Sequence, residues 1–481
     1  MGISRAGGLV SILLGAALQL PAQTQEESFR IYTEPPRLLL RPARLKLLTR
    51  ERERRSLRWQ QLETLILGKA PMPEPGFAYA LFYRVSGNSE QGRQAVQWAI
   101  AKARESQPAE LRQIALVFDW CQDLLSEPQA KALAAKLERG LAPARPGAAP
   151  PDLAVLRSRV LAAIALADRA PEVPARHLEL FVRDWWRLKT APALKAGRGR
   201  LTRDDMYPLV EILHAVRDNL QIEMRESAPG WFKELPLYLL ASYYPATYPA
   251  AENEYRIPAS HGTEDPDLRR ATLSRAAELS LLAYEPNAVE TQVLQGWLMH
   301  DRFLLRGTFG IPYEFLWANP YHPGLSYYHV PLILHDRLHG RLFVRSSWDD
   351  SATWLGYFDG ELQLFRDGMV TVLSPQLTSG PIALDEAVVF FGGNSRKFRV
   401  LLKDDEAVFV LGLKPNQKYD LEIDDEEIRE ARTDAGGILP LRLPPKIDVG
   451  VRIKEAGAPA AASDARADPV TDPAVNQQPG R

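Results

Sequence analysis

Residues 345–368 read RSSWDDSATWLGYFDGELQLFRDG, and this stretch decides the fold of the second half of the chain. Two short runs rich in aromatic, apolar and β-branched residues, 353–357 and 362–365, stand on either side of Asp359 and Gly360. Runs of this kind are typical of strands, and Asp and Gly favour turns. The stretch therefore predicts two short strands joined by a turn.

The same pattern extends in both directions from this stretch. After about Trp317 the chain shows short runs with a period near two, separated by Gly, Asp and Asn. Such runs predict an antiparallel β-sandwich, to which we assign residues 320–455. The runs are 329–334, 341–346, 353–357, 362–365, 370–373, 387–391, 398–402, 407–411, 419–423, 437–443 and 449–453.

The first half of the chain has a helical pattern. From about Pro42 to Gly296 apolar residues recur at intervals of three and four, as in amphipathic helices. Repeated helix pairs predict an α/α toroid or an α-solenoid, and the absence of a fixed-period repeat favours the toroid, which we assign to residues 35–310. The fold class is therefore α+β with two domains. The clearest helical segments are 44–67, 110–125, 128–141, 153–167, 175–188, 205–220, 229–244 and 267–284.

Three stretches resemble one known family. The run from Arg345 is similar to the start of the β-sandwich in heparinase II/III-like polysaccharide lyases, where an R-S-x-W-D-x-D-A-T-W-like run precedes an H-x-H-x-D segment. Residues 36–45 resemble the start of that family's helical domain, and residues 115–120 resemble its A-x-x-Y-D-W helix. The resemblance covers roughly residues 35–455. It implies a toroid followed by a sandwich, and an acidic polysaccharide or oligosaccharide as the partner.

The resemblance also implies β-elimination of a uronic-acid chain. That reaction neutralises the C5 carboxylate, removes the C5 proton and protonates the C4 oxygen. The family uses an Asn or His from the helical domain, a Tyr and a sandwich His. Here the segment between Leu355 and Leu362 lacks the histidines, and residues 143–153 contain neither Asn nor His. Asp152 in that segment is predicted to cap a helix.

Tyr207 is the position that matches. Residues 197–208 correspond to the family's glycine-rich segment before its catalytic Tyr, so we expect Tyr207 at the mouth of a helix and His214 on the same face. Nearby arginines, Arg200 and Arg203 among them, are expected to neutralise a carboxylate and to lower the pKa of the Tyr207 phenol. The alternative is a solvated basic loop and a tyrosine packed at a helix end.

Other residues are candidates to replace the missing functional residues of the family. His261 and His300 fall in loops near the expected domain junction and are candidate catalytic groups. Asp359 matches the family's acidic position, and Trp186 offers a face for a sugar ring. Each also has a structural interpretation, as a packed or turn residue. The spacing of the histidines at 322, 329, 335 and 339 supports no metal site, and we expect no cofactor.

The N-terminal segment predicts export, and the net charge bears on possible partners. Arg5 and an apolar run from Leu9 to Leu18 form the layout of a secretory signal cleaved near Ala22, so we assign residues 1–22 to it. A membrane anchor is the alternative, but the run is about half of the roughly 20 residues that span a bilayer. A formal net charge of −1 argues against nucleic-acid binding. Residues 456–481 are predicted to be disordered, and the single cysteine, Cys121, to be buried.

The sequence thus leaves three functional hypotheses open. The first is a periplasmic or secreted protein that acts on acidic polysaccharide by β-elimination, with no membrane span after signal cleavage. The second is a non-catalytic relative that binds a glycan or a protein. The third is an enzyme whose chemistry has moved to His261 or His300.

Overall fold

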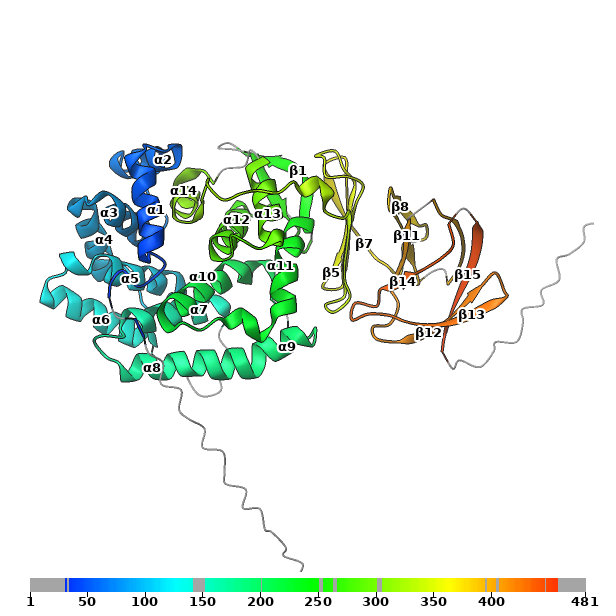
Figure 1. Cartoon of the computed structure of the whole chain (residues 1–481), viewed down its shortest axis with the longest axis horizontal. Coiled ribbons are helices and arrows are strands. Elements are labelled where there is room, and N and C mark those ends of the chain that lie inside the picture. Colours follow the sequence, from blue (N-terminus) through cyan, green and yellow to red (C-terminus); the bar gives the residue numbers. More distant parts are fainter. Residues whose placement is uncertain are drawn as a thin grey trace, which may run out of the picture.

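The computed structural model describes residues 31–456 except 33, 142–151, 200, 251–253, 263–265, 301–304, 394–395, 404–405 and 446. The predicted signal segment, Arg200 and all but the first residue of the predicted tail lie outside the described residues. Helices form the first part of the chain and strands the second (Figure 1), so the α+β prediction is confirmed. No helix of the described part combines the length and the apolarity that a membrane crossing requires.

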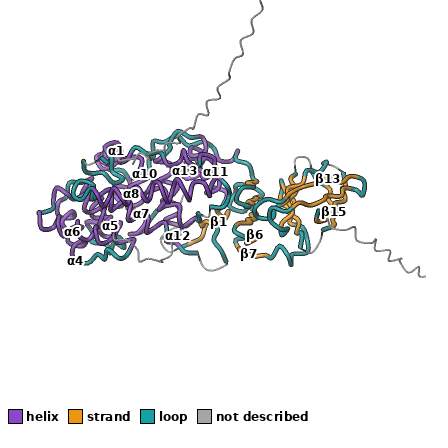
Figure 2. Tube along the Cα trace, turned by 90° about the horizontal axis from the view of Figure 1, so that it is seen from below, coloured by secondary structure: helices purple, strands orange, loops and turns teal. Residues whose placement is uncertain are grey.

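Helices occupy most of the chain as far as Trp317 (Figure 2). A π-helical segment, η2 (Leu180–Thr190), runs on from α8 into α9. The α-helices are α1 (Pro42–Glu53), α2 (Leu57–Leu67), α3 (Pro75–Ser86), α4 (Ser89–Ala101), α5 (Pro108–Trp120), α6 (Glu127–Leu141), α7 (Leu153–Ala165), α8 (Glu172–Glu179), α9 (Ala191–Lys195), α10 (Arg203–Leu220), α11 (Pro229–Ala241), α12 (Leu268–Tyr284), α13 (Val289–His300) and α14 (Gly307–Trp317).

Six of these helices contact one another in a cycle. The order of contact is α3, α5, α7, α10, α12 and α14, and α14 contacts α3 again. The pair α10 and α12 runs parallel. Arg203, at the start of α10, bonds to Ser274 of α12, while Arg217, near its end, bonds to the carbonyl of Tyr284. We call these six the inner helices. The helices α4 and α6 each contact the two inner helices that they connect.

The two shorter stretches of family resemblance pack against each other. The carboxylate of Asp119 in α5 accepts hydrogen bonds from the backbone N–H groups of Arg37 and Leu38, both at 2.8 Å. The Arg37 guanidinium pairs with the same carboxylate at 3.1 Å, and Trp120 Nε1 donates to the carbonyl of Leu38. All four residues are buried. These residues therefore fasten the start of the helical part to an inner helix.

The strands form four sheets. A hairpin of β1 (Tyr243–Pro249) and β2 (Glu254–Pro258), which the sequence analysis did not predict, lies between α11 and α12. The other sheets have the orders β3-β4-β5-β6-β7, β14-β11-β9-β8 and β10-β15-β12-β13. Their strands are β3 (Ile333–Asp336), β4 (Arg341–Arg345), β5 (Trp354–Phe358), β6 (Glu361–Arg366), β7 (Met369–Leu373), β8 (Ile382–Leu384), β9 (Ala387–Phe391), β10 (Lys397–Leu401), β11 (Ala407–Leu411), β12 (Lys418–Ile423), β13 (Glu427–Arg432), β14 (Leu439–Leu441) and β15 (Asp448–Glu455).

The β part departs from a simple antiparallel sandwich in two ways. First, three sheets are stacked. One face of the sheet β14-β11-β9-β8 packs on the five-stranded sheet, where Val389 and Leu355 belong to the same hydrophobic cluster. Its other face packs on the sheet that contains β12 and β15. Second, β9 and β11 pair in parallel. Because both faces are covered, every residue of β4, β5 and β9 is buried, so these strands show no alternation of burial.

The stretch that opens the sequence analysis joins the five-stranded sheet to the helices. Trp354 Nε1 donates to the carbonyl of Ala241, at the end of α11, at 2.9 Å. The Arg345 guanidinium donates to the carbonyl of Tyr243 at 2.9 Å. The predicted turn is confirmed at Asp359, which has a φ of 50°. The residues that carry the family resemblance are therefore architectural contacts.

Candidate functional site

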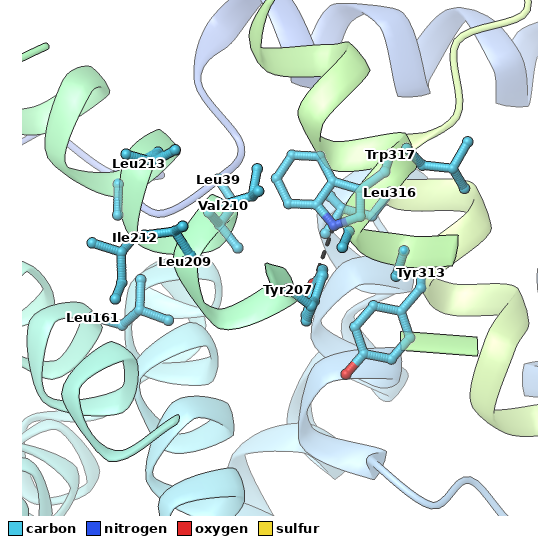
Figure 3. Packing of buried hydrophobic residues seen from close by; sticks show 14 of the residues in the cluster. Leu39, Leu161, Tyr207, Leu209, Val210, Ile212, Leu213, Tyr313, Leu316 and Trp317 are labelled. Carbon is cyan, nitrogen blue, oxygen red and sulfur yellow. Dashed lines mark hydrogen bonds between the residues drawn. The ribbon is translucent and has the colours of Figure 1, made fainter. Parts of the chain in front are cut away.

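Tyr207 lies in the interior of the helical part, where Figure 3 shows it against Trp317 and Tyr313. Its hydroxyl donates to Glu211 at 2.6 Å and accepts hydrogen bonds from Trp317 Nε1 at 3.1 Å and from Arg112 at 3.2 Å. The side chain is 1% exposed. Tyr207 lies near the start of α10 and is packed within the inner helices, in agreement with the alternative of a tyrosine packed at a helix end.

The expectation that nearby arginines lower the pKa of the Tyr207 phenol is wrong. Burial and the adjacent Glu211 carboxylate raise the pKa of the phenol well above its ordinary value, and Arg112 opposes this only in part. Arg203 points elsewhere: its guanidinium is buried and bonds to Ser274, Ser242 and Glu278. Arg200 lies outside the described residues. Tyr207 thus stays a neutral phenol.

A buried polar network surrounds this hydroxyl. Arg112 of α5 binds Glu211 of α10 at 2.8 Å, and Arg157 of α7 binds the same carboxylate at 3.2 Å. Glu74, the N-cap residue of α3, pairs with Arg112 at 3.4 Å and accepts a hydrogen bond from Tyr313 of α14 at 2.5 Å. Every member comes from or adjoins an inner helix. Such a network binds the inner helices to one another.

His214 and Trp186 are both buried. The prediction that His214 shares a helix face with Tyr207 is confirmed, since its ring packs on Trp317 at 4.6 Å. His214 Nε2 bonds to the carbonyl of Ser280 at 2.9 Å, and burial lowers the pKa of the imidazole well below its ordinary value. Trp186 is 1% exposed and donates to the carbonyl of Met224. Its ring is therefore not presented to a sugar.

Asp359 and His261 do come together, although they are far apart in sequence. His261 Nε2 lies 3.9 Å from an Asp359 oxygen, and His261 Nδ1 lies 3.4 Å from Glu361. Arg341 approaches Asp359 at 3.4 Å, and the imidazole ring packs against Phe358. The His261 side chain is 58% exposed. This is an open polar cluster at the β5–β6 turn.

His300 occupies a third location. It ends α13, is exposed, and contacts the rings of Tyr327 and Tyr328. Its Nε2 lies 3.5 Å from the Tyr328 hydroxyl. The described contacts of Tyr207, His261 and His300 share no residue. The three candidate catalytic groups therefore do not form one constellation.

The acidic loop before α12 gives no metal site in the described residues. Asp267 caps α12 by accepting hydrogen bonds from the N–H groups of Arg269 and Arg270 at 2.9 and 3.1 Å. Glu264 and Asp265 lie outside the described residues. Elsewhere in the described part, no group of three or more His, Cys, Asp or Glu side chains is placed to hold a metal ion.

A cavity of about 460 Å³, which was not predicted from the sequence, is bounded by β2 and by the first turns of α12 and α14. We call it the α12–α14 cavity. Its wall includes Tyr255, Phe309, Arg269 and Arg306, and the Arg269 guanidinium lies 4.8 Å from the centre of the Phe309 ring. It also adjoins Pro73, next to Glu74 of the buried network.

The start of α14 gives this cavity a positive character. Arg306 is the N-cap residue, and no side chain among the described residues caps the helix. The first N–H groups of a helix have no intrahelical acceptor and favour anions. Gly307 has a φ of 70°, which favours glycine. The signal in the sequence for this uncapped helix start was Arg306, which stands in place of a usual cap residue directly before the apolar helix that begins at Gly307.

Comparisons with known proteins do not place the chain in a family. No protein-family model matches it, and no curated protein matches its sequence. Among solved structures, one described as "Glycoside hydrolase" aligns with 10% identity and a TM-score of 0.31, covering 90% of this chain and 79% of that one. A similarity this remote is no basis for assigning the fold or the activity of that protein to this chain.

Proposed function

We propose that this protein binds an acidic polysaccharide or oligosaccharide in the α12–α14 cavity. The observation that carries the proposal is the uncapped start of α14 beside Arg269 and Arg306. A helix N-terminus and two guanidinium groups provide donors and positive charge for a uronate carboxylate. Phe309, in the same wall, provides an apolar face of the kind against which sugar rings pack.

The architecture that we propose for the helical part is the α/α toroid of residues 35–310. The cyclic contacts of the six inner helices support it. In that arrangement the α12–α14 cavity lies at the end of the ring where α12 and α14 begin. The signal-like layout of residues 1–22 adds export to the periplasm or the exterior to this proposal.

Of the alternatives, binding without β-elimination has the better support. A catalytic base or acid must lie within hydrogen-bond reach of the transferred proton. The Tyr207 hydroxyl is occupied by Glu211, Arg112 and Trp317, and its pKa is raised. The separate positions of His261 and His300 likewise favour the non-catalytic alternative over relocated chemistry.

Calorimetric titration of the full chain with uronate-containing and neutral oligosaccharides tests this function. We expect binding of the uronate ligands only, and a roughly tenfold weaker affinity for Arg269→Gln, since charged hydrogen bonds contribute about 1.5–3 kcal/mol. Arg93→Gln, on the exposed surface of α4, is the matched control and should bind like the wild type. Unchanged affinity in Arg269→Gln would exclude the assigned site.

The absorbance of unsaturated uronates tests the absence of lyase chemistry on the same ligands. We expect no rise during incubation with the full chain. A rise that persists in Arg93→Gln and disappears in His261→Gln would contradict the non-catalytic proposal and establish the relocated chemistry instead.

A further inference from the structure

A second cavity, of about 520 Å³, lies at the other ends of α12 and α14. We call it the basic pocket. Ala283 near the end of α12 and Trp317 at the end of α14 contribute to its wall, together with residues of α1 and α10. Among the described residues that line it, Asp218 alone carries a negative charge. Five carry a positive charge: Arg41, Arg44, Lys46, Arg50 and Arg217.

Two of these cations are anchored by helix ends. The Arg44 guanidinium donates to the carbonyl of Trp317 at 3.3 Å, and the Arg217 guanidinium donates to the carbonyl of Tyr284 at 2.9 Å. Arg217 also binds Asp218 at 3.1 Å. Binding of helix C-terminal carbonyls is a sufficient structural reason for Arg44 and Arg217. It does not account for the other three.

The Arg41 guanidinium stacks over the Tyr32 ring, 3.6 Å from its centre, whereas Lys46 and Arg50 have no such contact among the described residues. Within the described part of the chain, none of the three forms a hydrogen bond or ion pair with a carboxylate. Arg41 Nη1 is shielded from solvent and has no hydrogen-bond partner. Burial, with Arg217 nearby, lowers the pKa of Arg44 to about 10 although Asp218 opposes the shift. The pocket thus gathers positive charge that its own acid does not balance.

The start of α1 adds to this field. Arg41 is its N-cap residue, no side chain among the described residues caps the helix, and its first turn contains no acidic residue. Pro42, the first helical residue, has no N–H, but the next two residues, Ala43 and Arg44, line the pocket and their N–H groups have no intrahelical acceptor, at the positive end of the helix dipole.

We propose that the basic pocket binds a compact oxyanion, a sulfate or phosphate ester group. Several cations and a helix N-terminus around one small cavity match a compact group with three or more acceptor oxygens better than a single carboxylate. The ester would belong either to a sulfated saccharide or to a phosphorylated small molecule. This inference goes beyond the proposed glycan site, because the two cavities lie at opposite ends of α12 and α14.

Titration calorimetry of the full chain at low ionic strength provides the test, with inorganic sulfate and inorganic phosphate as the probes and chloride at matched ionic strength as the blank. We expect saturable binding of at least one probe. Arg41→Gln and Lys46→Gln should each weaken it roughly tenfold. Lys131→Gln, whose side chain is 75% exposed on α6, should have no effect. No heat with either probe, or equal affinity in Arg41→Gln and Lys46→Gln, would overturn the proposal.

The same variants separate this pocket from the glycan site. Arg269→Gln should leave the affinity for sulfate and phosphate unchanged, and Lys46→Gln should leave the affinity for unsulfated uronate oligosaccharides unchanged. Loss of anion binding in Arg269→Gln would contradict the basic pocket alone. A sulfated disaccharide and a phosphorylated sugar then identify the source of the ester, since the one that competes with the inorganic probe carries the matching group.

Discussion

The Tyr207 hydroxyl connects α5, α10 and α14 through its bonds to Arg112, Glu211 and Trp317. We predict that Tyr207→Phe lowers the free energy of unfolding by about 1–3 kcal/mol, because buried partners of a lost hydroxyl stay unsatisfied. Urea unfolding followed by circular dichroism measures the change. Tyr248→Phe, at a side chain that is 37% exposed, should change stability little. Equal stability of Tyr207→Phe and the wild type would show that the Tyr207 hydroxyl does not stabilise the fold.

His214 makes stability depend on pH near neutrality. Its pKa lies well below the ordinary value because of burial, whereas in the unfolded chain it takes up a proton near pH 6.5. Below that pH the unfolded state binds more protons, so stability falls as pH falls, by up to about 1.4 kcal/mol per pH unit for this group. Burial also lowers the pKa of His177 and His322, which adds to the fall in the same window.

Urea midpoints between pH 7.5 and 5 measure this dependence. His214→Gln should flatten the slope, whereas His300→Gln, at an exposed residue, should retain it. An unchanged slope in His214→Gln would assign the whole dependence to other groups.

At the residue level, roles that depend on neighbours along the chain were predictable, whereas burial that depends on distant helices was not. The capping role of Asp152 is confirmed by its bond to the N–H of Val155 at 2.7 Å, and Cys121 is buried as expected. Both follow from neighbours along the chain. The burial of Tyr207 depends on Arg112 and Trp317, which approach it from helices distant in sequence, so no local pattern could indicate it.

At the level of elements, β5 carries the contact between sheet and helices. Trp354 is fully buried, bonds to the carbonyl of Ala241, and packs on Tyr244 and Phe343. We predict that Trp354→Ala destabilises the protein by about 3–5 kcal/mol, the usual cost of emptying a large aromatic site. Thermal unfolding measures this loss. Tyr328→Ala, at a side chain that is 51% exposed, serves as control, and a similar loss in both variants would contradict the prediction.

The errors in element boundaries have physical causes. The predicted helix 44–67 is two helices, because Arg55 adopts a φ of 53° and Ser56 caps α2 by accepting from the N–H of Trp59. The strand β13 was missed because nearly all of its residues are exposed, which leaves no alternation. The parallel pairing of β9 with β11 depends on contacts between sheets. Of these, only the Ser56 cap had a signal in the sequence.

At the level of the whole molecule, the five-stranded sheet belongs to two cores. Phe343, Trp354 and Phe365 on one face join the core of the helical part, whereas Leu355 and Leu362 on the other face join the core shared with the sheet of β9 and β11. Figure 1 shows β5 and β7 between the helices and later strands such as β8, β11 and β15. The sequence predicted two domains, but it gave no indication of a layer common to both, since that depends on which face each strand presents.

This shared layer predicts that helices and strands unfold together. Chains of this length often unfold in separate steps, so a single transition is informative. Loss of the five-stranded sheet would expose apolar surface on both neighbours at once, which couples their stabilities. We expect tryptophan fluorescence, far-ultraviolet circular dichroism and calorimetry to give coincident transitions. Leu355→Ala, which empties a site on the strand side only, should lower that transition as a whole. Two resolved transitions would mean that the sheet does not couple the two cores, if Leu355→Ala lowers only the transition of the strand part.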